Sequence, residues 1–165
     1  MKNIVLTILA VAPFFISAQT NSKNEINWVS LEDAKVLAKK YNEKILIFFY
    51  KKNCPYCDQM KKETLSDPTV VDIINRNFFS VNIDSRTKDT IYYNNIAYSN
   101  QQPIEHGHTF RHDFYAEVAS VKRKNTTHIT TPTIAVFNEN FKKITILPGN
   151  HPKQLLLRRL KEHIK

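Results

Sequence analysis

Glycine and cysteine are both scarce in this chain of 165 residues, which contains two of each. So few glycines cannot supply a glycine-rich loop that cradles phosphates, and this class of nucleotide site is therefore excluded. A single pair of cysteines leaves a structural zinc site short of two ligands, which histidines would have to provide. The second cysteine, Cys57, is followed by Asp58 and not by histidine, so the pair is not a c-type haem attachment site.

Long apolar runs are also lacking, and the one near the N-terminus, from Ile4 to Ile16, is interrupted by Pro13. This run is too short to predict a transmembrane helix. Lys2 precedes it and the small residues Ser17-Ala18 follow it, which is typical of a secretory signal peptide. We therefore expect residues 1–18 to be a cleaved signal peptide and residues 19–165 to be one exported domain, with an uncleaved anchor as the alternative.

Negative charge is the minority, and the formal net charge is +9 at pH 7. The basic side chains are scattered along the chain, and no aromatic stripe accompanies the densest clusters, at 122–124 and 158–159. Such a distribution is typical of a solvated basic surface and not of a nucleic-acid interface. We expect no nucleic-acid partner and no membrane association of the mature domain.

The most informative stretch surrounds the two cysteines. The apolar run Ile45 to Tyr50 is short, aromatic and β-branched, which predicts a buried strand. Asn53 is a good helix N-cap and Pro55 suits a first helical turn, so Cys54 is expected at the start of a helix. Free N–H groups and the helix dipole favour a thiolate there, and the thiolate is the nucleophile in disulfide exchange. Cys57, one turn later, is placed to attack a mixed disulfide formed at Cys54.

Two other uses of the cysteine pair stay open. A structural disulfide is one, although so short a ring removes little chain entropy. A zinc or copper site that recruits histidines is the other.

Sequence patterns around the cysteines predict alternating helices and strands. The first helix begins at Ser30 in a capping box with Asp33 and ends at Asn42, and Asp67-Pro68 begins another. Period-two or apolar runs predict strands at 78–84, 133–137 and 143–147, the last two joined by the turn 138–140. Pro152 begins a final helix, whose apolar side is predicted to consist of Leu155, Leu156, Leu160 and Ile164.

These motifs together resemble the thioredoxin superfamily. A strand, the motif Cys54-Pro55-Tyr56-Cys57 and a helix are followed later by Thr131-Pro132-Thr133, a hairpin and a terminal helix. The phrase Glu63-Thr64-Leu65-Ser66-Asp67-Pro68, with Val70 after it, is similar to secreted thioredoxin-like proteins of Gram-negative bacteria. The resemblance covers residues 26–84 and 128–165. It implies an α/β thioredoxin-like fold, a central mixed sheet flanked by helices, with an insertion at about 85–127 before a cis-proline.

The resemblance implies a periplasmic thiol–disulfide oxidoreductase. Cys54 and Cys57 would be catalytic, and Pro55, Tyr56, Thr131 and Pro132 would bind substrate, with the Thr131 backbone free to pair with a substrate strand next to a cis Thr131–Pro132 bond. No metal or other cofactor is implied. The expected partners are disulfide- or thiol-bearing proteins and a membrane or periplasmic electron partner. We expect the protein to be a reductase, with a disulfide-forming oxidase as the alternative, because direction depends on a reduction potential.

Two departures from the family pattern affect this interpretation. Glutaredoxins share the Cys-Pro-Tyr-Cys motif but bind glutathione through a Gly-Gly segment, which is replaced here by Pro148-Gly149-Asn150. Typical thioredoxins have a buried Asp six residues before the first Cys, thought to help deprotonate the second Cys, and Phe48 is at that position. Another group, such as Glu43 or a water molecule, would have to serve.

The insertion is the hardest part to interpret. Residues 90–98 predict a hairpin that turns at Asn94-Asn95, and 110–124 predict a helix with Phe114, Val118 and Val121 on one side. We expect the insertion to be a lid that selects substrates. The alternative, a metal site, would use His106 and His108 between these two elements, with His112 after them as a third ligand and Asp113 beside it.

Overall fold

The computed structural model of the chain describes residues 25–101 and 110–164. The predicted signal peptide, and His106 and His108 of the alternative metal site, lie outside the described residues. None of the described helices is both long enough and apolar enough to cross a membrane.

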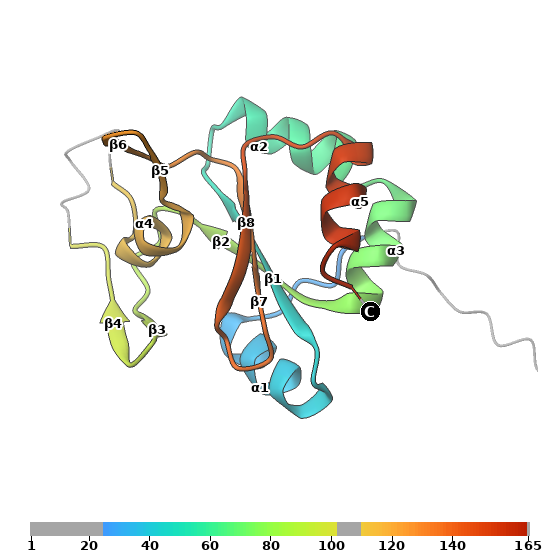
Figure 1. Cartoon of the computed structure of the whole chain (residues 1–165), viewed down its shortest axis with the longest axis horizontal. Coiled ribbons are helices and arrows are strands. Elements are labelled where there is room, and N and C mark those ends of the chain that lie inside the picture. Colours follow the sequence, from blue (N-terminus) through green and yellow to red (C-terminus); the bar gives the residue numbers. More distant parts are fainter. Residues whose placement is uncertain (1–24, 102–109, 165) are drawn as a thin grey trace, which may run out of the picture.

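Figure 1 shows the helices and strands in chain order. Before segment 85–127 they are α1 (Leu31–Tyr41), β1 (Lys44–Tyr50), α2 (Pro55–Gln59), the π-helix η1 (Met60–Thr64), α3 (Pro68–Asn77) and β2 (Phe78–Asp84). From that segment onward they are β3 (Ile91–Tyr93), β4 (Ile96–Tyr98), α4 (Asp113–Ala119), β5 (Val121–Arg123), β6 (Thr126–His128), β7 (Thr133–Phe137), β8 (Lys143–Pro148) and α5 (Lys153–Lys161).

The central sheet has the strand order β2-β1-β7-β8. Strand β1 is parallel to β2 and antiparallel to β7, and β8 is antiparallel to β7. Trp28 adds an isolated parallel bridge to Ser80 of β2. The predicted α/β fold with a central mixed sheet flanked by helices is therefore confirmed.

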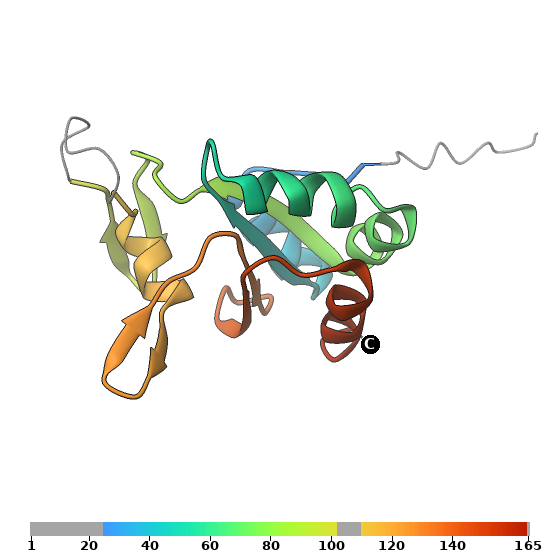
Figure 2. The same ribbon diagram turned by 90° about the horizontal axis from the view of Figure 1, so that it is seen from above.

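Side chains of β1 alternate between the two faces of the sheet, because successive residues of a strand point in opposite directions. Leu46 and Phe48 join a first core, which η1, α3 and α5 cover. Ile45, Ile47 and Phe49 join a second core, which α1 and segment 85–127 cover. Figures 1 and 2 show α4 and the short strands β3 to β6 on the opposite side of the sheet from α3 and α5.

The helix ends follow the sequence signals for caps. Ser30 caps α1 by accepting from the Asp33 backbone N–H, and its hydroxyl donates to the Asp33 carboxylate. Asn42 ends that helix in the left-handed conformation, at φ 55°. Asp67 caps α3 by accepting from the N–H groups of Thr69 and Val70. The last helix is shifted in detail, since Leu157 is buried where Leu155 was expected.

Segment 85–127 departs most from expectation. Its first hairpin turns at Asn94-Asn95 as predicted, and both residues have positive φ. The predicted helix 110–124 is wrong in extent, because α4 stops at Ala119 and Val121 begins a second hairpin, β5–β6. The prediction extended the helix because Val121 follows Val118 at helical spacing. One apolar residue at that spacing is not enough to show that a helix continues.

Candidate active site

The two cysteines are in contact at the start of α2. Both are free thiols, and their Sγ atoms lie 2.6 Å apart. The Cys54 carbonyl accepts from the backbone N–H groups of Cys57 and Asp58, at 2.9 and 3.0 Å. This first helical turn holds the Cys57 side chain against Cys54, as thiol–disulfide exchange within the pair requires.

The start of α2 differs by one residue from the prediction. Cys54 is itself the N-cap, with extended backbone at φ −114° and ψ 104°, and Asn53 precedes the helix in the left-handed conformation at φ 56°. Asparagine adopts the left-handed conformation more readily than most residues, so Asn53 suits this position although it does not cap the helix. Pro55 occupies the first turn as expected. No side chain caps α2, and its first turn offers few N–H groups, because Pro55 has none and those of Cys57 and Asp58 donate to the Cys54 carbonyl.

The two sulfurs differ in exposure. Cys54 is 7% exposed and Cys57 is fully buried, while Tyr56 between them is 65% exposed. Burial and the hydrogen bond to Cys54 raise the pKa of Cys57 to about 12, although a backbone hydrogen bond from Lys51 and, to a smaller extent, the Lys61 ammonium lower it. A reagent or substrate that approaches from solvent therefore reaches Cys54 first, and Cys57 keeps its proton until a later step.

Thr131 and Pro132 meet the cysteine pair from the other side. The Thr131–Pro132 peptide bond is cis, as the resemblance implied, and the Thr131 carbonyl oxygen lies 3.9 Å from Cys54 Sγ. The Pro132 carbonyl accepts from the Gly149 N–H at 2.8 Å, and Gly149 has φ 91°, which favours glycine. Cys54 and Thr131 thus lie at one surface, with Cys57 and Pro132 buried behind them and Pro55 and Tyr56 exposed beside it.

Tyr115 of α4 is a site residue that the sequence did not reveal. Its hydroxyl donates to the Thr130 carbonyl at 2.7 Å and lies 3.0 Å from Thr131 Oγ1. The one available signal was a tyrosine among apolar residues of a predicted helix, because a buried tyrosine hydroxyl needs a partner. That signal could not say which residue is the partner.

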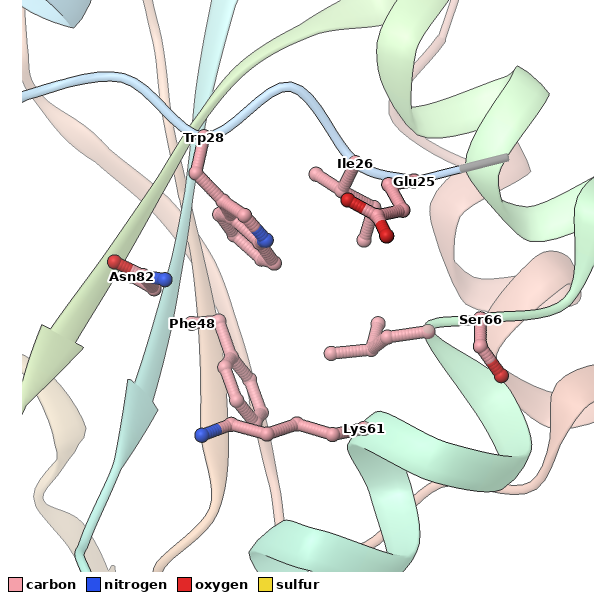
Figure 3. A pocket seen from close by; sticks show the side chains of 8 residues that line it. Glu25, Ile26, Trp28, Phe48, Lys61, Ser66 and Asn82 are labelled. Atoms are coloured by element: carbon pink, nitrogen blue, oxygen red, sulfur yellow. The ribbon is translucent and has the colours of Figure 1, made fainter. Parts of the chain in front are cut away.

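Phe48, at the position of the expected acid, is fully buried in the first core. The Lys61 ammonium lies over the rings of Tyr50 and Phe48, at 3.8 and 5.9 Å from their centroids. Figure 3 shows Lys61 extended along the Phe48 ring at the edge of a pocket that Trp28 also lines. Glu43 precedes β1, roughly 20 Å of strand away from the cysteine end, so the suggestion that it serves Cys57 was wrong.

His112 has a structural role. It is fully buried and caps α4, with Nδ1 accepting from the Phe114 N–H at 3.1 Å and Nε2 lying 2.8 Å from the Asp89 carbonyl. Since the carbonyl only accepts, Nε2 carries the proton and both ring nitrogens are engaged. Within residues 25–101 and 110–164, no group of three His, Cys, Asp or Glu side chains could hold a metal ion.

Comparisons with known proteins agree with this fold. The family model described as a thioredoxin-like domain matches residues 31–164. Among solved structures, the chain is similar to a thioredoxin from Thermus thermophilus, with 19% identity, a TM-score of 0.57, and 84% of this chain and 87% of that chain covered. It is also similar to the oxidoreductase DsbH, with 16% identity, a TM-score of 0.56, and 84% and 83% covered. The reduced C-terminal domain of Neisseria meningitidis DsbD follows, with 16% identity, a TM-score of 0.51, and 80% and 92% covered. A search of curated proteins found no match.

Proposed function

Because this chain belongs to the family of thioredoxin-like domains, we propose that it is a thiol–disulfide oxidoreductase that reduces protein disulfides through Cys54 and Cys57. The observation that carries the proposal is the contact between the two free thiols beside the cis Thr131–Pro132 bond. The fold of the family and a thiol pair at a helix start together support this activity.

The exchange proceeds in two steps. The Cys54 thiolate attacks one sulfur of a client disulfide, and the first client thiolate leaves and takes up a proton. Cys57 then loses its proton and attacks Cys54 Sγ, which releases the second client thiol and leaves a Cys54–Cys57 disulfide. Two electrons and two protons pass to the client, and a dithiol electron donor must reduce the new disulfide. Burial of Cys57 supports this order, since only Cys54 reaches solvent.

The client is proposed to bind as an extended segment. The Thr131 backbone lies next to Cys54, and an extended chain that pairs with it would bring its disulfide to the sulfur. Pro55 and Tyr56 lie on the exposed rim of the same surface, where they would contact the client. Glutathione is not needed in this scheme.

The proposed location is the periplasm. The N-terminal pattern of Lys2, an apolar run and Ser17-Ala18 supports a signal peptide at 1–18, and the domain would then be 19–165 with its insertion at about 85–127. The partners would be disulfide- or thiol-bearing proteins and a membrane or periplasmic electron donor. An oxidase of the same fold would run the same steps in reverse with a different electron partner.

Single replacements of the two cysteines test the mechanism. Cys57→Ser should accumulate mixed disulfides with client proteins that a reductant dissolves, because Cys57 is needed for release. Cys54→Ser is the matched control and should trap nothing, because it lacks the attacking sulfur. Covalent complexes are measured on non-reducing gels before and after reduction. The mechanism is wrong if Cys57→Ser traps no client while the unmodified protein turns over a disulfide substrate. Equal loss of bound zinc or copper in both variants, without trapping, would favour the metal alternative.

A further inference from the structure

Tyr115 connects segment 85–127 to the substrate side of the active site. It lies on α4, is fully buried, and packs its ring on Phe49 of β1, with centroids 4.8 Å apart. Its hydroxyl contacts the Thr130–Thr131 segment. The carbonyl oxygen of Thr131 in this segment lies next to Cys54 Sγ. A side chain of the second core thereby touches the backbone that the proposed function uses to bind clients.

The directions of these hydrogen bonds follow from their partners. A carbonyl only accepts, so the Tyr115 hydroxyl gives its single proton to Thr130 O. The contact with Thr131 must then run the other way, with Thr131 Oγ1 donating to the Tyr115 oxygen. Thr133 Oγ1 also donates to Thr130 O, which fills both lone pairs of that carbonyl.

Adjacent polar groups of the Thr130–Thr131 segment therefore have different partners. The Thr130 carbonyl and the Thr131 hydroxyl are both committed within the protein, while the Thr131 carbonyl faces Cys54 Sγ at 3.9 Å. Burial raises the pKa of Tyr115, so its hydroxyl stays a donor well into the alkaline range. This arrangement therefore persists throughout the pH range in which thiol exchange takes place.

We propose that Tyr115 is a positioning residue of the redox site, which fixes the Thr130–Thr131 backbone for an extended peptide around the client disulfide. This proposal rests on the proposed function and adds the residue through which segment 85–127 controls it. Tyr115 contacts neither sulfur in this role. It acts by holding the peptide-pairing edge, and its contribution therefore depends on how much of that edge the substrate uses.

Two substrates of different size separate this role from a general effect on folding. Hydroxyethyl disulfide reaches Cys54 without pairing with Thr131, whereas a disulfide-bearing peptide needs the edge. Tyr115→Phe keeps the ring and removes the hydroxyl. We expect it to lower kcat/KM for the peptide about tenfold, mainly through KM, and to change kcat/KM for hydroxyethyl disulfide less than about twofold, since one lost buried hydrogen bond corresponds to roughly this much binding energy.

Tyr93→Phe is the matched control. Tyr93 lies in the same core, with its ring 5.4 Å from that of Phe114, and its replacement should leave the ratio of the two kcat/KM values unchanged. Equal loss with both substrates in Tyr115→Phe, or an equal shift of the ratio in Tyr93→Phe, would overturn the positioning role. If the unmodified protein reduces neither substrate, the proposed function fails instead, and the two failures are thus distinguishable.

A double-mutant cycle keeps the test decisive should Tyr115→Phe lose stability. Thr131→Val removes the hydroxyl that donates to Tyr115 and nearly preserves the shape of the side chain. If the two residues act through that hydrogen bond, the combined variant should lose less activity on the peptide than the product of the single losses. Losses that multiply would overturn the Tyr115–Thr131 hydrogen bond as a positioning contact.

Discussion

The two cores on opposite faces of the sheet are built from different side chains. The first core, under the cysteine-bearing helix, consists mainly of aliphatic residues from α3 and α5 packed on Leu46 and Phe48. The second core is aromatic, because segment 85–127 adds Tyr93, Phe114 and Tyr115 to Phe49 and Phe137 of the sheet. Phe137 and Phe141 stack at 4.6 Å, and the rings of Tyr93 and Phe114 lie nearly edge-on at 5.4 Å. Aromatic pairs prefer such offset or edge geometries, which limits how these elements can shift against each other.

The two cores therefore support different parts of the active site. The first core supports the helix that presents Cys54 and buries Cys57, whereas the second core supports Tyr115 and through it the Thr130–Thr131 backbone. Cys54 and Tyr115 both contact the segment that directly precedes β7. The segment is accordingly part of the folded core in its described portion, and a role in selecting substrates would be exerted through the backbone next to Cys54.

The largest expected effect tests whether the two cores are one folding unit. Phe114→Ala in the second core should destabilise the protein by about 3–5 kcal/mol, and Met60→Ala in the first by about 2–5 kcal/mol, because both side chains are fully buried. The single tryptophan, Trp28, packs on Phe48, with ring centroids 6.3 Å apart, so its fluorescence reports the first core. We expect Phe114→Ala to lower the urea midpoint seen by Trp28 as well as that seen by circular dichroism.

The exposed Tyr92 on β3 is the control for this comparison. It is 63% exposed, so Tyr92→Ala should change the free energy of unfolding by no more than about 0.5 kcal/mol. An unchanged Trp28 midpoint in Phe114→Ala would mean that segment 85–127 unfolds separately, as an appended lid.

The first face of the sheet was largely predictable from the sequence. Strand β1 and helix α3 have strong local signals, an unbroken apolar run and an Asp-Pro helix start, and both were predicted close to their observed bounds. The cysteine motif lies between such elements, so its place at a helix start followed from them. The cap itself was off by one residue, since Asn53 and Cys54 compete for that position and only backbone geometry separates them.

The second face was less predictable, because its contacts are distant in the sequence. The partners Tyr115 and Thr130, and the ring pair Tyr93 and Phe137, share no local pattern that would associate them. The β5–β6 hairpin turns at Lys124-Asn125, and its short strands are exposed, so they lack the alternation that identifies a strand. Tertiary packing decides such segments, and a single sequence does not reveal it.

The next effect concerns the pH dependence of stability on the cysteine side. Burial raises the pKa of Cys57 from its ordinary value of 9.0 to about 12. Between these values the unfolded chain has lost this proton and the native protein retains it, so the free energy of unfolding should fall as pH rises. The stabilising difference is complete below pH 9 and is lost toward pH 12.

Urea unfolding of the fully reduced protein across this range measures the slope. Cys57→Ser is the control, since it removes the thiol in question and leaves every other residue of the chain in place. Its free energy of unfolding should fall less steeply with pH. Parallel curves for the two proteins would show that the native environment leaves the Cys57 proton unprotected.

The smallest expected effect concerns Lys61 and the rate of the second step of the exchange. Its ammonium lies on the Tyr50 ring and lowers the pKa of Cys57, although burial outweighs it. Lys61→Met keeps the apolar stem and removes the charge, so Cys57 should form its thiolate less readily. Because the side chain is exposed and its charge is screened, we expect resolution of the mixed disulfide to slow about two- to threefold, below the tenfold that a full pKa unit would give.

A chromogenic aromatic disulfide, mixed with the reduced protein in a stopped-flow instrument, reports both steps of the exchange. The first coloured thiolate leaves when Cys54 attacks, and the second leaves when Cys57 displaces it from Cys54. Lys61→Met should slow only the second phase, and the difference should shrink at high salt, because screening weakens interactions between exposed charges. Lys62→Met, the neighbouring exposed lysine, should slow neither phase. A slower first phase, or an effect of Lys61→Met that is insensitive to salt, would mean that Lys61 acts through packing on Tyr50 and Phe48 and not through its charge.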